Sequence, residues 1–166
     1  MESEASTRRW GALALAAAMA VVVGTALAFQ HLGGYIPCAL CLEQRTPYYL
    51  GIPVLLAAFV AASLKAPPAL VRVLIAIGGL LMLWSLVLGV RHAGVEWDWW
   101  AGPTDCGVVA PVDTGGGGVL DAIDTMLPPS CDEAAGRFLG LSFAGWNALS
   151  SLVLAAAAFW LAARRR

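Results

Sequence analysis

The chain has 166 residues, of which 60% are hydrophobic and 13% are charged, and its mean hydropathy is +0.76. Average soluble domains are about half apolar and about a quarter charged, so this composition excludes an ordinary water-soluble domain. Ten basic residues against eleven acidic ones give a formal net charge of −1, which is too little positive charge for a nucleic-acid-binding surface. The composition therefore predicts a membrane protein that does not bind nucleic acid.

Four long apolar stretches predict transmembrane helices, since about 20 apolar residues are needed to cross a bilayer. The predicted helices cover about residues 10–29, 46–64, 72–90 and 142–163. The first apolar run continues past Phe29, but the polar residues Gln30, His31, Gly33 and Gly34 are expected to end its helix there. We predict an all-α membrane protein in which residues 1–166 form a single four-transmembrane-helix bundle. Its outer loops are expected at about residues 30–45 and, between helices three and four, 91–141.

The basic residues lie mostly on one side of these predicted helices, and positive charge marks the cytoplasmic side of a membrane protein. Seven of the ten share that side: Arg8, Arg9, Lys65, Arg72, Arg164, Arg165 and Arg166. We therefore predict that both termini are cytoplasmic and that the chain lies in the bacterial inner membrane. All four cysteines fall on the other side, in the periplasm, where disulfides persist: Cys38, Cys41, Cys106 and Cys131.

A cleaved signal peptide is the alternative for the N-terminus, with a cleavage site at 26–28. The preceding apolar run is longer than the roughly 7–15 residues of a usual signal peptide, so an uncleaved helix is favoured.

Three features mark the long outer loop. Four residues at 97–100 include three tryptophans, which predicts an aromatic belt at the membrane interface. Glycines at 115–118 predict a flexible hinge. The stretch Val119–Leu127 has apolar residues at helical spacing and predicts a short amphipathic helix, which either lies on the membrane surface or packs against the bundle.

Cys38 and Cys41 form a CxxC pair at the outer mouth of the second predicted helix, directly after Pro37. A thiol near a helix N-terminus has a lowered pKa, and the thiolate is its reactive form. Arg45 follows Cys41 by four residues, so a continuous helix would place both side chains on one face. Its positive charge would stabilise a Cys41 thiolate or a reduced, anionic electron acceptor. The alternative is that Arg45 only anchors the helix at the membrane interface.

Two interpretations without redox chemistry remain open for the cysteines. A CxxC pair is also half of a zinc site, and His31 and His92 could supply ligands, although no second CxxC is present and we expect no metal. The cysteines could instead form structural disulfides in a membrane scaffold. A CxxC disulfide closes a small loop, however, and stabilisation by cross-linking grows with loop length, which favours exchange for this pair.

The cysteine motifs resemble those of the disulfide bond formation protein B (DsbB) family. The similar segments are Gln30-His31, Pro37-Cys38-Ala39-Leu40-Cys41, Gln44-Arg45, Arg91-His92-Ala93-Gly94-Val95-Glu96-Trp97, Pro103-Thr104-Asp105-Cys106, and Cys131 before Phe138-Leu139-Gly140-Leu141. They cover nearly the whole chain in order. The early position of the CxxC pair distinguishes this pattern from enzymes of the vitamin K epoxide reductase type, in which the motif lies late in the chain.

The resemblance implies a protein-dithiol:quinone oxidoreductase that supports disulfide bond formation, with two redox-active disulfides, Cys38–Cys41 and Cys106–Cys131. It implies that a periplasmic DsbA-like protein of thioredoxin fold is oxidised at Cys106, after which Cys131 attacks Cys38. Electrons would then leave through Cys41 to a membrane quinone, ubiquinone or menaquinone. Gln44, Arg45 and His92 are the expected quinone-site residues, although His92 could equally be an interfacial histidine at a helix end.

Overall fold

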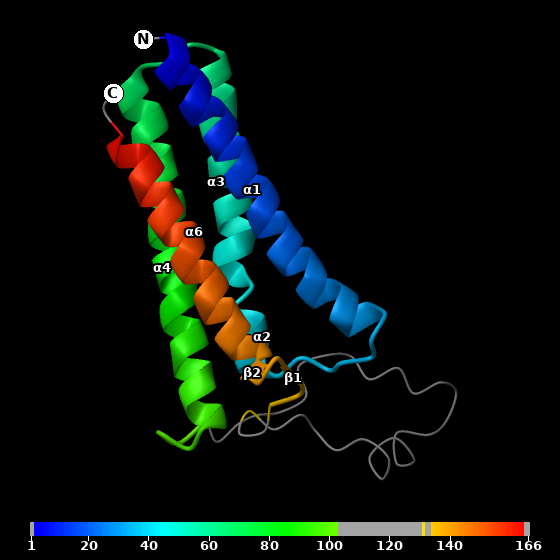
Figure 1. The fold of residues 1–166 in the computed structure, drawn as a ribbon. Helices are drawn as coiled ribbons and strands as arrows, with labels where there is room; N and C mark the ends of the chain where they lie inside the picture. Colours follow the sequence, from blue (N-terminus) through cyan, green and yellow to red (C-terminus); the bar gives the residue numbers. More distant parts are fainter. Residues whose placement is uncertain (1, 103–130, 132–133, 165–166) are drawn as a thin grey trace.

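The computed structural model describes residues 2–102, 131 and 134–164, and these residues form a bundle of long helices (Figure 1). The long helices are α1 (Glu2–His31), α3 (Thr46–Ser63), α4 (Pro68–Glu96) and α6 (Phe143–Ala163). All four regions are long and apolar enough to cross a membrane. The predicted four-helix architecture is thus confirmed, and the chain is a multi-pass membrane protein.

Helices α1 and α4 extend further than the sequence predicted. α1 begins at Glu2 and ends at His31, not near Phe29, and α4 covers 68–96 where 72–90 was expected. The prediction ended each helix at a charged residue or a polar cluster, but helical hydrogen bonding continues into the interface, where long charged side chains reach water. The outer loop therefore begins after Glu96, and residues 91–96 form the last turns of α4.

Short α2 (Ala39–Glu43) contains Cys41, has Cys38 as its N-cap residue and is separate from α3. The four-residue spacing had suggested that Cys41 and Arg45 share one helical face, but they do not, because Gln44 ends α2 and Arg45 is the N-cap residue of α3. Pro47 gives the physical reason: it has no N–H group to continue the hydrogen bonding of α2, but fits the first turn of a new helix.

A small antiparallel hairpin leads into α6, and it contains the only β-strands among the described residues. Strand β1 (Arg137–Phe138) pairs with β2 (Leu141–Ser142), and the two turn residues between them have positive φ angles. Ser142 was predicted to be the first helical residue. It is instead the N-cap of α6, where its hydroxyl accepts a hydrogen bond from the backbone N–H of Gly145 at 3.2 Å.

Helix α4 packs between α3 and α6, and α1 packs mainly against α3. Small side chains let the backbones of α4 and α6 approach closely: a Cβ atom added at Gly89 would lie 3.0 Å from the backbone nitrogen of Ala148. Close approach at small residues is a common basis of helix association in membranes.

Both termini lie at one end of the bundle, and α2 and the two strands lie at the other (Figure 1). Basic residues at the terminal end bind carbonyl groups of α6 and the residue after it. Arg8 Nη2 donates to the Arg164 carbonyl at 2.7 Å, and Arg72 Nε donates to the Ala162 carbonyl at 2.9 Å. Cations stabilise the carboxyl ends of helices, so these contacts hold the terminal end together.

Several predicted features lie outside the described residues. They are Cys106, the glycine run at 115–118 and the amphipathic helix at Val119–Leu127.

Candidate redox centre and adjoining cavity

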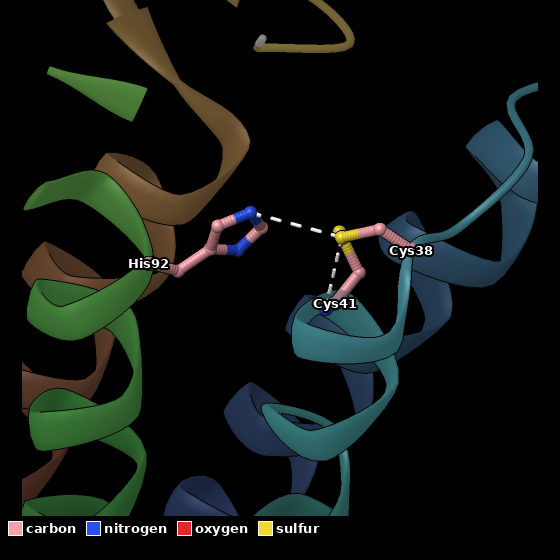
Figure 2. Close-up of side chains that lie close together, drawn as sticks. All are labelled: Cys38, Cys41 and His92. Carbon is pink, nitrogen blue, oxygen red and sulfur yellow. Dashed lines mark hydrogen bonds between the residues drawn. The ribbon is translucent and has the colours of Figure 1, made fainter. Parts of the chain in front are cut away.

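The sulfur atoms of Cys38 and Cys41 lie together at the start of α2 (Figure 2). Cys38 is the N-cap residue, and its Sγ donates a hydrogen bond to Cys41 Sγ at 2.9 Å. This hydrogen bond and then burial raise the pKa of the Cys38 thiol to about 12. Cys38 therefore keeps its proton at neutral pH while both sulfurs are reduced.

Cys131 contributes a third sulfur to this end of the molecule. Its side chain is completely buried and packs in one apolar cluster with Cys38, Leu40 and Val95, with Cys41 at the edge. A residue from the long outer loop thus lies beside the CxxC pair. Thiol–disulfide exchange requires direct attack of one sulfur on another, and three of the four cysteines lie close together in this cluster.

His92 faces Cys38 from the end of α4 (Figure 2). Its Nε2 lies 3.7 Å from Cys38 Sγ, and its Nδ1 lies 2.7 Å from the side-chain nitrogen of Gln44. His92 is almost completely buried, and it acts on Cys38 in the direction of a lower pKa, against the larger effects of Cys41 and burial. Its position is therefore inside the site and not at an exposed interface.

Glu96 also lies in this buried region, one helical turn after His92. Its Oε1 is 3.8 Å from His92 Nε2, and only 4% of its side chain is exposed. The second carboxylate oxygen, Oε2, has no hydrogen-bond partner among the described residues. A buried carboxyl group with an unpaired oxygen is costly, which is typical of functional positions.

A buried polar network continues from Gln44 into the bundle. Asn147 on α6 donates to Gln44 Oε1 at 2.7 Å and accepts from the Tyr48 hydroxyl at 2.8 Å. Ser85 on α4 and Ser151 on α6 complete the network through hydroxyl contacts, with Ser151 Oγ donating to Ser85 Oγ at 2.8 Å. The network thus connects the vicinity of the CxxC pair with the start of α3 and the middle of α4 and α6.

A cavity of about 520 Å³ adjoins Cys41 between α1 and the amino-terminal half of α6. Its walls are largely apolar, with Val21 and Ala26 on α1 facing Phe143 and Ala144 on α6. In Figure 1, α1 leans away from α6 toward this end of the bundle. The polar side chains that line the cavity include Gln30, Cys41, Gln44, Arg45, Tyr48, His92 and Asn147.

Arg45 approaches this cavity although it is not on the helix of Cys41. The guanidinium is half-buried, and its Nη1 donates to Gln30 Oε1 at 2.5 Å, linking the start of α3 to the end of α1. The structure thus brings together Cys38, Cys41, Gln44, Arg45 and His92, all of which were predicted as site residues.

Three of the predicted residues could also bind a metal, because the ligand atoms of Cys38, Cys41 and His92 lie within 4.8 Å of one another. The other histidine considered as a zinc ligand, His31, is outside this cluster. The neighbouring Gln44 side chain disfavours a metal. Its Nε2 faces His92 Nδ1, so Nδ1 must accept a hydrogen bond and the ring hydrogen stays on Nε2, the atom that faces the sulfurs.

Sequence reasoning missed four residues at this site: Gln30, Tyr48, Glu96 and Asn147. Asn147 carried a usable signal, because a polar amide within an apolar transmembrane segment is rare and usually has a functional or packing role. Gln30 and Glu96 had been assigned to loops, so their positions on helices facing the site were not considered.

Comparison with known proteins gives the chain a family. It matches the family described as "Disulfide bond formation protein DsbB" over residues 8–161. A relative from Aromatoleum aromaticum (strain DSM 19018 / LMG 30748 / EbN1), named "Disulfide bond formation protein B", is 29% identical over 170 residues, covering 100% of this chain and 99% of the relative. No solved structure matched the chain. Because the family match includes all four helices and all four cysteines, the chain belongs to the DsbB family of membrane proteins, with an oxidoreductase role in disulfide bond formation.

Proposed function

We propose that this protein oxidises a periplasmic DsbA-like thiol protein and transfers the two electrons to a membrane quinone. The observation that carries the proposal is the apolar cavity next to Cys41. Its volume, about 520 Å³, is within the range of small-molecule sites, and an apolar lining with a few convergent polar groups is typical of them. A quinone has an apolar ring and tail and two carbonyl oxygens, which suits this lining.

The first half of the reaction is thiol–disulfide exchange at the outer loop. A thiolate of the partner attacks Cys106 of the Cys106–Cys131 disulfide, which gives a mixed disulfide and releases Cys131. The partner's second thiolate then attacks the mixed disulfide, so the partner leaves oxidised and Cys106 is a thiol. Because the reduction potential of a DsbA-type disulfide is as high as about −120 mV, only a high-potential acceptor can drive this direction.

The second half transfers the electrons to the CxxC pair. Cys131 attacks Cys38 of the Cys38–Cys41 disulfide, and Cys41 leaves as the thiolate. Cys106 then attacks Cys131, which restores the loop disulfide and releases Cys38. The packing of Cys131 against Cys38 supports this order of attack. When the CxxC disulfide re-forms, two electrons and two protons pass to the quinone, giving the quinol.

Side chains around the cavity have specific roles in electron transfer from the CxxC pair to the quinone. Cys41 opens onto the cavity and is the sulfur that reacts there, while Cys38 is covered. Arg45 supplies a permanent positive charge beside the cavity, which stabilises negative charge developing on a quinone oxygen. Gln44 and His92 also line the cavity and would contact a quinone bound there.

The proposed orientation places the cysteine end of the bundle in the periplasm and both termini in the cytoplasm, in the bacterial inner membrane. The grouping of Arg8, Arg72 and Arg164 at the terminal end supports it, because basic residues are enriched on the cytoplasmic side.

The test is quinone reduction by the full-length protein in lipid nanodiscs, given a reduced DsbA-like partner and measured by quinone absorbance. Ala26→Phe fills the cavity from α1 and should raise the KM for quinone. Ala28→Phe is the matched control, since Ala28 is an exposed residue of the same helix that does not line the cavity. No quinone reduction by the unmodified protein, or equal quinone KM values in the two variants, would contradict the proposal.

A further inference from the structure

The side-chain amide of Gln44 is held in one orientation by two partners of opposite type. Its Nε2 donates to the Leu40 carbonyl at 3.2 Å, and its Oε1 accepts from Asn147 Nδ2 at 2.7 Å. Rotation of the amide by half a turn would bring its oxygen against the carbonyl and its nitrogen against another nitrogen donor. Both hydrogen bonds would be lost in a buried environment, where unpaired polar groups are costly.

Asn147 also contacts hydroxyl groups of α3 and α4, which can donate or accept. Its Oδ1 accepts from the Tyr48 hydroxyl at 2.8 Å, and its Nδ2 lies 3.3 Å from Ser85 Oγ. Asn147 presents its nitrogen, and not its oxygen, to Gln44. This direction follows from the Leu40 carbonyl, which only accepts: Gln44 presents its nitrogen to that carbonyl and its oxygen to Asn147.

The orientation of Gln44 determines which ring nitrogen of His92 carries the hydrogen. Gln44 Nε2 donates to His92 Nδ1 at 2.7 Å, so Nδ1 must be the acceptor nitrogen of the ring. A neutral imidazole carries one N–H group, which must then be on Nε2. That nitrogen faces Cys38 Sγ at 3.7 Å and Glu96 Oε1 at 3.8 Å.

We propose that Asn147 is a positioning residue that acts through Gln44 to hold His92 in the Nε2–H tautomer, so that His92 faces Cys38 as a hydrogen-bond donor and not as a base. The tautomer follows from the hydrogen-bond network alone, and its use in thiol chemistry rests on the proposed function. A donor at this position favours negative charge on the Cys38 sulfur during exchange, when burial and the neighbouring thiol oppose that charge.

The direct test is the tautomer of His92 in the full-length protein, read from ¹⁵N chemical shifts and two-bond ¹H–¹⁵N couplings. The chain has two histidines, so His31→Gln leaves a single histidine signal. The expected result is an unprotonated Nδ1 and a protonated Nε2. A protonated Nδ1 in this protein would overturn the proposal without any further variant.

Asn147→Asp tests the part played by Asn147. An aspartate carboxylate only accepts hydrogen bonds, so Gln44 should turn its nitrogen toward it and its oxygen toward His92 Nδ1. The ring hydrogen should then move to Nδ1. Ser150→Ala is the matched control on the same helix, because the Ser150 hydroxyl donates to the Trp146 carbonyl and lies outside the network. An unchanged His92 tautomer in Asn147→Asp would contradict the proposal.

A chemical readout accompanies the spectroscopic one. In a variant whose other three cysteines are serine, a small thiol reagent should modify Cys38 about three- to tenfold more slowly after Asn147→Asp, as expected for loss of one hydrogen bond. Equal rates would contradict the proposal. Neither measurement uses the thiol partner or quinone. The expected tautomer with no quinone reduction would therefore refute the proposed function alone. The other tautomer together with normal quinone reduction would refute this inference alone.

Discussion

Arg45→Gln is expected to slow quinone reduction while partner oxidation at Cys106 stays largely unchanged. The Arg45 guanidinium lines the cavity next to Cys41, and one of its nitrogens is engaged by Gln30. Arginine has five N–H donors, so this contact leaves most of them for an acceptor in the cavity. Glutamine keeps a similar length and polarity but removes the charge.

The size of the effect follows from the type of interaction lost. A hydrogen bond to a charged group contributes about 1.5–3 kcal/mol, and partial exposure of this guanidinium favours the lower end of that range. A loss of about 1.5–2 kcal/mol lowers kcat/KM for quinone roughly 10- to 30-fold. Arg45→Lys should fall between the variant and the unmodified protein, because lysine keeps the charge but lacks the planar fork.

The assay is steady-state quinone reduction over a range of quinone concentrations, combined with single-turnover oxidation of the partner. Arg91→Gln is the matched control: Arg91 is half-exposed, lies 3.8 Å from Glu43 and does not line the cavity. Unchanged quinone kinetics in folded Arg45→Gln protein would show that Arg45 is an interface anchor, and equal losses in both variants would show a general charge effect.

Three further predictions concern the relay, the topology and the packing. Cys106→Ala should abolish partner oxidation but leave the CxxC pair able to react with quinone, and partner turnover at the normal rate would mean that the loop pair is structural. A reporter fused after Arg166 should be active only in the cytoplasm, and periplasmic activity would reverse the orientation. Gly89→Ala, which brings a Cβ within 3.0 Å of the Ala148 nitrogen, should destabilise the bundle by about 1–3 kcal/mol in thermal unfolding followed by circular dichroism. Gly24→Ala adds a Cβ with no atom within 4 Å and should not destabilise it; equal destabilisation would exclude close packing as the cause.

The existence of the four helices could be predicted from sequence because a bilayer sets the length of an apolar segment. Their ends could not be predicted as well, since charge marks where a helix leaves the apolar region and not where its hydrogen bonding stops. For this reason Glu96, which was expected in the outer loop, lies on α4. The break between Cys41 and Arg45 was missed although Pro47 was visible, because a four-residue spacing also fits one continuous helical turn.

The residues of the site were predicted from chemically recognisable motifs, but their connections were not. Nothing in the local sequence says that Gln30 meets Arg45 or that Asn147 meets Gln44, because these pairs lie on different helices. Such contacts depend on which faces of the helices pack together. A single sequence gives little information on those faces when every side of a transmembrane helix is apolar.

The polar network around Asn147 also decides which of several similar helix arrangements the chain adopts. Lipid and leucine side chains are about equally apolar, so apolar contacts distinguish poorly between one helix register and the next. Interhelical hydrogen bonds in membranes contribute on average only about 0.6 kcal/mol each, so the contacts of Tyr48, Ser85 and Ser151 add modest stability. Sliding α6 by one turn would separate all of them at once and leave several buried polar groups unpaired. The network therefore fixes the register of α3, α4 and α6 relative to one another. Apolar replacements of similar size would preserve much of the stability but weaken the preference for one register.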